Sequence, residues 1–252
     1  MIESLDIFAL LVLAAFLAGF VDSIAGGGGL VTVPVLLVAG FSPIQALATN
    51  KFQGLFGTAS AAVTYGLRGH VSLKTQIGPA ILAFVASGLG ALLITYIPAD
   101  NIRFILPFLL IGVALFFWLK PGLDDQNRTQ RISPMVFTAL IVPLIAFYDG
   151  FFGPGAGSFF MLAFVTLSGF GILTATAHTK LLNFASNVGG FVVFAFAGAV
   201  VWQVGLAMGV AQIAGAQVGA RLAIKNGARL IKPLLTLTCL ALAARLLWEN
   251  YS

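Results

Sequence analysis

Long apolar stretches separated by short polar segments run through the whole of this 252-residue chain. Many of them contain roughly twenty residues, the length that a helix needs to cross the hydrocarbon core of a bilayer. They lie at residues 5–22, 43–66, 75–97, 101–119, 134–152, 173–200, 202–224 and 229–248. Two shorter apolar runs, 30–41 and 157–169, do not cross easily alone and are predicted to be half-helices. The pattern predicts an all-α membrane protein.

The composition agrees with a lipid environment. Hydrophobic residues make up 60% of the chain and charged residues 8%, and the mean hydropathy is +1.04, so there is too little polar surface to solvate a globule of this size. Glu3 precedes the first apolar stretch and Asp6 lies at its start, where a signal peptide would have basic residues, so this stretch is predicted to be a retained helix. The one cysteine, Cys239, excludes an internal disulfide and a multi-thiolate metal site, and no cofactor or metal is expected.

The basic residues, which give the chain a net charge of +5, predict its orientation in the membrane. They lie at the ends of apolar runs rather than on one basic face, so no nucleic-acid partner is expected. If the two short runs turn back, one side of the membrane collects Arg68, Lys74, Lys120, Arg128, Arg131, Arg221, Lys225, Arg229 and Lys232, against Arg103 and Arg245 on the other. Because short basic loops stay cytoplasmic, both termini are predicted to lie outside the cytoplasm.

One motif occurs twice in the chain. The two copies read GFVDSIAGGGGLVTVPVLL at 19–37 and AFYDGFFGPGAGSFFMLAFV at 146–165. Each copy places one carboxylate, Asp22 or Asp149, in an apolar run and follows it with a glycine-rich break. One lysine, Lys51 or Lys180, comes about thirty residues after the carboxylate. Duplicated halves with charge inside the membrane are typical of transporters.

The similarity extends beyond the motif, since TNKFQG at 49–54 aligns with HTKLLN at 178–183. The chain is therefore predicted to consist of two inverted repeats of about four transmembrane helices each, with glycine-broken or re-entrant half-helices. The first repeat covers 1–120 and the second 134–252, joined by a cytoplasmic linker at 121–133. Together they form one membrane domain, because in such transporters the site lies between the repeats.

The glycine breaks predict an anion site. Lipid cannot satisfy unwound backbone groups, so the breaks must face a cavity or the other repeat. A half-helix that starts after each break, at Leu30 or Ser158, points its unpaired N–H groups and the positive end of its dipole into that cavity. The candidate glycines are Gly26, Gly27, Gly28, Gly29, Gly153, Gly155 and Gly157. Gly215 and Gly219, by contrast, are predicted to serve close helix packing.

Lys51 and Lys180 have two interpretations, which can both hold. A lysine at the bilayer centre costs about 2.5 to 3.5 kcal/mol on insertion scales, and an anionic cargo would offset part of that cost. The lysines can also form structural or coupling ion pairs with Asp22 and Asp149. Neighbouring side chains that could donate to cargo oxygens include Asn50 and Asn183, and His178 is a weaker candidate for proton coupling.

The residues also resemble a known family. GFVDSIAGGGGL with ATNK in the first half, and FYDGFFGPGAGSF with HTKLLN in the second, are similar to the sulfite exporter TauE/SafE family, also called toluene sulfonate uptake permeases. The resemblance covers essentially the whole chain. It implies a permease of the bacterial inner membrane that moves sulfite, sulfonates or other small sulfur-containing anions. The motif region has no cysteine, unlike thiosulfate-handling relatives that use thiols.

These observations predict a transporter of a small anion by alternating access, with the anion held between the two breaks by backbone amides and by Lys51, Lys180 or both. The alternative is a proton-coupled cation carrier that uses Asp22 and Asp149. An enzyme is not expected, because the chain has no paired-histidine or nucleophile motif. The expected partners are the small anion and the lipid bilayer. The oligomeric state is open, with a homodimer as one option.

Overall fold

The computed structural model describes residues 5–98, 101–102, 126, 128–227 and 229–230. All regular elements in these residues are helices, which confirms the predicted all-α class. They are α1 (Leu5–Ala25), α2 (Gly28–Val38), α3 (Pro43–Leu67), α4 (Leu73–Thr95), α6 (Pro134–Val136), the π-helix η1 (Phe137–Ile141), α7 (Val142–Phe151), α8 (Ala156–Thr166), α9 (Ile172–Phe196) and α10 (Trp202–Asn226). The predicted helices at 101–119 and 229–248 and most of the linker lie outside the described residues.

Four helical segments of the described chain are long and apolar enough to cross a membrane: Leu5–Ala25, Lys74–Thr95, Pro134–Phe151 and Ile172–Phe196. Helices α3 and α10 contain 25 residues each but are less apolar. The reason is that they carry polar side chains toward the interior, such as Gln53 and Thr58 of α3 and Gln212 of α10, which are all buried. Helices α2 and α8 are short and apolar, as predicted for the two half-helices.

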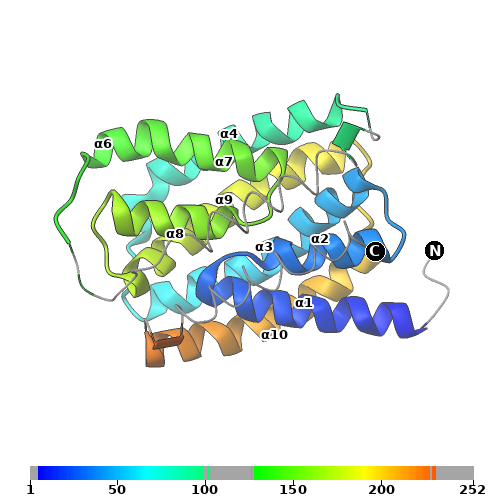
Figure 1. The fold of residues 1–252 in the computed structure, drawn as a ribbon, viewed down its shortest axis with the longest axis horizontal. Helices are drawn as coiled ribbons and strands as arrows, with labels where there is room; N and C mark the ends of the chain where they lie inside the picture. The colour runs from blue at the N-terminus through cyan, green and yellow to red at the C-terminus, as the bar shows by residue number, and fades with distance from the viewer. Residues whose placement is uncertain (1–4, 99–100, 103–125, 127, 228, 231–252) are drawn as a thin grey trace, which may run out of the picture.

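In Figure 1, α1 of the first half runs from right to left, whereas α6 to α7 of the second half run from left to right. Helix α2 turns back along α1, so that Gly28 lies against the Ala18 carbonyl oxygen. The two half-helices lie in the middle of the molecule, between α1 and α10 on one side and α4 and α7 on the other (Figure 1). How each half is oriented relative to the two sides of the membrane stays a prediction.

The two halves are packed into one another rather than placed side by side. Helix α1 of the first half packs along α10 of the second, and α7 of the second half packs along α4 of the first. A methyl group at Gly215 would overlap the Phe16 carbonyl of α1, and one at Gly150 would overlap the Ser87 carbonyl of α4. The close packing predicted for Gly215 is therefore confirmed, and glycine serves the same purpose at the second contact between the halves.

The lysine-bearing helices α3 and α9 begin at well-defined residues. The side chain of Ser42 accepts a hydrogen bond from the Gln45 amide at 3.3 Å, and the Gln45 side chain accepts one from the Ser42 amide at 3.1 Å. This reciprocal cap precedes Pro43, whose fixed φ suits the first helical position. Helix α9 starts after Gly171. The two helices contact each other and bring Lys51 and Lys180 into the core of the molecule.

The unwound segments are shorter than the sequence predicts. Helix α1 ends at Ala25 and α2 already begins at Gly28, so only Gly26 and Gly27 separate them, with φ values of 71° and 130°. In the second half, α8 begins at Ala156 rather than after the whole glycine cluster. The expected half-helix starts at Leu30 and Ser158 are therefore wrong by two residues. Glycines at a helix start can remain helical, and only those that need a positive φ lie outside the helices.

Candidate functional site

The first break is organised by the carboxylate that precedes it. Asp22 lies in the last turn of α1, and its Oδ1 accepts hydrogen bonds from the amides of Gly27 at 3.0 Å and Gly28 at 3.1 Å. These amides belong to the start of α2, where the first N–H groups have no partner inside the helix. Asp22 therefore caps the positive end of the α2 dipole.

Side chains from other elements satisfy the carbonyl groups at the end of α1. Lys180 donates to the Asp22 carbonyl, and Tyr65 donates to the Ser23 carbonyl at 2.9 Å. The Ser158 hydroxyl lies 2.9 Å from the Ala25 carbonyl and also contacts the Gly26 carbonyl. A helix end inside the membrane needs such partners, because lipid offers none. Two of these donors come from the second half, so the first break depends on the second half for its structure.

The second break lies directly against the first. Helix α7 ends at Phe151, and Gly153 and Gly155 adopt φ values of 94° and 86° before α8 begins. The Tyr148 hydroxyl donates to the Pro154 carbonyl at 2.7 Å and holds this turn. A methyl group at Gly26 would overlap the backbone of Gly157. The two glycine segments, far apart in the sequence, are thus in contact, as a site between them requires.

Both predicted lysines form ion pairs, and each pair joins the two halves. The Lys51 amine lies 2.5 Å from Asp149 Oδ1, and the Lys180 amine lies 3.2 Å from Asp22 Oδ2. The exposed fraction of the lysine side chains is 2% for Lys51 and 0% for Lys180. Each lysine thus pairs with the carboxylate of the other repeat rather than with the one in its own repeat.

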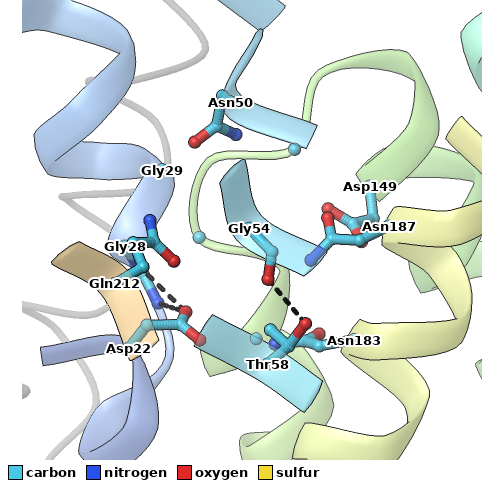
Figure 2. A pocket seen from close by; sticks show the side chains of 14 residues that line it. Asp22, Gly28, Gly29, Asn50, Gly54, Thr58, Asp149, Asn183, Asn187 and Gln212 are labelled. Atoms are coloured by element: carbon cyan, nitrogen blue, oxygen red, sulfur yellow. Dashed lines mark hydrogen bonds between the residues drawn. The ribbon is translucent and has the colours of Figure 1, made fainter. Parts of the chain in front are cut away.

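A buried polar pocket lies where the two breaks meet, and we call it the seam pocket (Figure 2). The volume that the centres of water molecules can occupy in this pocket is about 40 Å³. That is enough for a few water molecules or one small ion. Its walls are formed by Asp22, Gly27, Gly28, Gly29, Asn50, Gly54, Thr58, Asp149, Gly153, Gly155, Gly157, Asn183, Asn187 and Gln212. Elements of both halves contribute to it, namely α1, α2, α3, α7, α8, α9 and α10.

The seam pocket contains most of the residues that the sequence predicts for the site. Both carboxylates, both predicted asparagines and all the predicted glycines except Gly26 line it. Lys51 and Lys180 do not line it and lie behind the carboxylates that they pair with. His178 lies apart from the ion pairs, with its Nδ1 2.8 Å from Gln76 Nε2.

Four further lining residues lie outside the carboxylates, glycines and two asparagines singled out above: Gly54, Thr58, Asn187 and Gln212. Gly54 could be found from the repeat, because it aligns with the predicted Asn183 at the offset that aligns the lysines, whereas Thr58 aligns with Asn187, which is outside that set as well. Gln212 lies in α10 without a motif around it. Among the described residues, no three His, Cys, Asp or Glu side chains gather to form a metal site.

Comparison with known proteins gives a family match along nearly the whole chain. The family model of the sulfite exporter TauE/SafE matches residues 11–246. The chain belongs to the TauE/SafE family.

Two bacterial relatives match it over nearly its whole length. The probable membrane transporter protein ORF9 of Sinorhizobium sp is 59% identical over 241 residues, which are 96% of this chain and 92% of that protein. The probable membrane transporter protein YfcA of Escherichia coli K12 is 46% identical over 245 residues, which are 97% and 91% of the two chains. No solved structure matches the chain. Family and apolar helices together make it a multi-pass membrane protein of a transporter family.

In this TauE/SafE protein the charges around the seam pocket balance. Two aspartates line the pocket and two lysines stand directly behind them. All four carboxylate oxygens already accept a hydrogen bond or an ion pair: Asp22 from Gly27, Gly28 and Lys180, and Asp149 from Lys51 and Ser186. An ion that enters the pocket therefore meets a neutral, dipolar wall, unless it displaces one of these partners.

Proposed function

We propose that the protein moves small anions, such as sulfite or organic sulfonates, across the membrane by alternating access at the seam pocket. The observation that carries the proposal is that the N-termini of α2 and α8, one from each half, meet at one buried polar pocket. The positive end of a helix dipole and unpaired N–H groups favour an anion, typically by about 0.3 to 1 kcal/mol per helix and up to about 2 when partly buried.

The N-terminus of α8 is the more open of the two. Asp22 occupies the amides of Gly27 and Gly28 at α2. At α8, the carboxylate of Asp149 contacts Lys51 and Ser186 instead, and among the described residues no carboxylate bonds to the amides of Gly155 or Gly157. Both of these glycines line the pocket. An anion can therefore use the α8 amides without displacing a protein group.

Sulfite and sulfonates are proposed as the cargo on two grounds. The description of the matching family names sulfite. The pocket is also small and polar, which suits a compact oxyanion better than a large apolar molecule. Rocking of one half against the other would then expose the pocket to each side in turn. With the cell interior negative, export of an anion is favoured by about 2.3 kcal/mol per charge per 100 mV, so export needs no second ion.

A proton-coupled cation carrier is the second candidate, because the two aspartates line the pocket whereas the lysines do not. A cation, however, would have to compete with the partners that already occupy all the carboxylate oxygens. The cation carrier is therefore the less well supported of the two candidate functions.

Flux measurements on purified protein in lipid vesicles separate the two candidates. Vesicles loaded with sulfite, methanesulfonate, thiosulfate or acetate are expected to release at least one of these anions at a saturable rate, faster when the interior is made negative. Vesicles without protein serve as the control. Sodium, potassium or proton flux without any anion movement would contradict the anion transporter and support the cation carrier.

We further propose that the protein lies in the bacterial inner membrane with both termini outside the cytoplasm, a placement that rests on the basic residues at helix ends. A phosphatase reporter, active only outside the cytoplasm, is expected to be active when fused after Ser252 and inactive when inserted in the linker at 121–133. A reporter active in the linker and inactive at the C-terminus would invert the proposed topology. Cross-linking in membranes would decide whether a homodimer forms.

A further inference from the structure

We propose that the cargo is bound directly by neutral N–H donors, with Asn187 as a specificity-determining ligand and Lys51 as the residue that positions it. The inference rests on the anion transport proposed above and names the chemical class that the pocket selects. That class is an anion with several acceptor oxygens. The side of the anion that contacts the pocket-lining NH₂ groups has no hydrogen-bond donor. Lys51, on this view, acts through Asn187 and does not touch the anion.

The orientation of the Asn187 amide is fixed by Lys51. The lysine amine lies 3.2 Å from Asn187 Oδ1, and an ammonium group can only donate hydrogen bonds. The contact partner must therefore be the oxygen of the amide, which leaves the NH₂ group as the end that faces the pocket. Figure 2 shows this nitrogen directed toward Gly54 and the centre of the pocket. A methyl group on Gly54 would lie 3.2 Å from it.

The side-chain amide of Asn50 also has its oxygen bonded to protein groups and its nitrogen beside the pocket, but its hydrogen-bond partners are different. Its Oδ1 accepts hydrogen bonds from Thr32 Oγ1 at 2.6 Å and from Gln53 Nε2 at 3.4 Å. Its NH₂ group is again the end without a protein partner among the described residues, and it lies beside Gly29. The nitrogen of Asn183 likewise lies against Gly157. Three asparagine nitrogens thus each abut a pocket-lining glycine, whose missing side chain leaves them accessible.

The lysine amines are not available in the same way. Lys51 already contacts Asp149 Oδ1 and Asn187 Oδ1, and Lys180 already contacts two oxygen atoms of Asp22. Both lysines are almost fully buried and neither lines the pocket. Their charges balance the two carboxylates, so the negative charge of the cargo meets amide donors and the helix N-termini instead. A wall of this kind discriminates by the number and direction of acceptor oxygens rather than by charge alone.

The test compares variants of Asn187 by their dissociation constants for sulfite and methanesulfonate, measured by titration calorimetry on the purified full chain. Asn187→Leu removes the donor, and Asn187→Asp puts an acceptor in place of it at nearly the same volume. Both are expected to raise the dissociation constant by about 10- to 100-fold, the range for a lost hydrogen bond to a charged group. The transport KM should rise while the maximal rate changes little. Gln217→Leu is the matched control, because Gln217 bonds to Ser60 on a helix of the same core but does not line the pocket.

A cycle of variants tests whether Lys51 acts through Asn187. The charge-balanced pair Lys51→Met with Asp149→Leu avoids an unpaired buried charge, and Asn187→Leu is then added to it. If Lys51 acts through Asn187, adding Asn187→Leu to this pair raises the dissociation constant for sulfite by a smaller factor than Asn187→Leu does in the unaltered protein. An equally large effect of Asn187→Leu with and without the pair would show that Lys51 does not position Asn187 and would overturn the inference, as would an unchanged dissociation constant in both Asn187 variants. If the unaltered protein neither binds nor moves any of the four test anions, it is the proposed function that fails.

Discussion

Replacing Lys51 by methionine is expected to lower the free energy of unfolding by about 3 to 5 kcal/mol, the cost of breaking a buried ion pair at one partner. Asp149 would keep only its hydrogen bond from Ser186 and would remain as an uncompensated buried charge. Lys180→Met should cost less, because Asp22 keeps the amides of Gly27 and Gly28. Unfolding of the purified protein in detergent, followed by circular dichroism during heating, measures both effects.

Because Lys51 pairs with Asp149 and Lys180 with Asp22, the loss of stability in Lys51→Met should be reversed by a second change at one aspartate and not at the other. Asp149→Leu added to Lys51→Met should restore most of the lost stability, because a buried ion pair replaced on both sides by apolar groups is often neutral. Asp22→Leu added to the same Lys51→Met should not restore it, since Asp22 pairs with Lys180. Rescue by Asp22→Leu and not by Asp149→Leu would mean that each lysine pairs within its own repeat, against the geometry described above.

The sequence alone could not have chosen between these two pairings. Asp22 and Lys51 have nearly the same separation along the chain as Asp149 and Lys180, so the duplicated pattern allows pairing within a repeat and between repeats equally. The choice depends on how α3 and α9 dock against the ends of α1 and α7. That docking is set by close contacts such as Gly150 on Ser87. Gly150 belongs to the doubled motif, but nothing in the motif indicates that Ser87 of the other half is its partner.

Other features of the fold and the site could be predicted from the sequence. The apolar stretches and the doubled motif predict the helices, the two half-helices and a meeting of both glycine clusters, and the described part of the chain has all three. The extent of the unwound backbone was not predictable, because Gly28 and Gly29 are small residues inside α2 whereas Gly26 and Gly27 need positive φ. Composition does not distinguish these two uses of glycine.

The role of the lining residue Asn187 could not be predicted from the sequence, for a different reason. It lies within α9, two turns beyond Lys180, and its amide could equally serve as a bond between helices. Only the contact of its oxygen with Lys51, a residue of the other half, indicates which end of the amide faces the pocket. Information of this kind depends on tertiary structure, because the two residues are distant in the sequence and belong to different repeats.

Replacing Gly26 by alanine is expected to disrupt the contact between the two breaks and to abolish transport. Two physical effects add at this position. The φ of 71° is unfavourable for alanine, which costs on the order of 1 to 3 kcal/mol. The added methyl group would also overlap the backbone of Gly157, which cannot rotate away as a side chain can, and overpacking adds about 1 to 3 kcal/mol.

Gly40→Ala is the matched control for this prediction. Gly40 has a φ of 90°, so alanine is strained there as well, but nothing lies within 4 Å of the added methyl group. The difference between the two variants therefore isolates the contact between the halves from the backbone strain. Gly26→Ala should unfold at a lower temperature than Gly40→Ala and lose saturable anion flux, while Gly40→Ala keeps it. Equal stability and equal flux in the two variants would show that the glycine breaks do not need to touch, and the seam pocket would lose its role as the transport site.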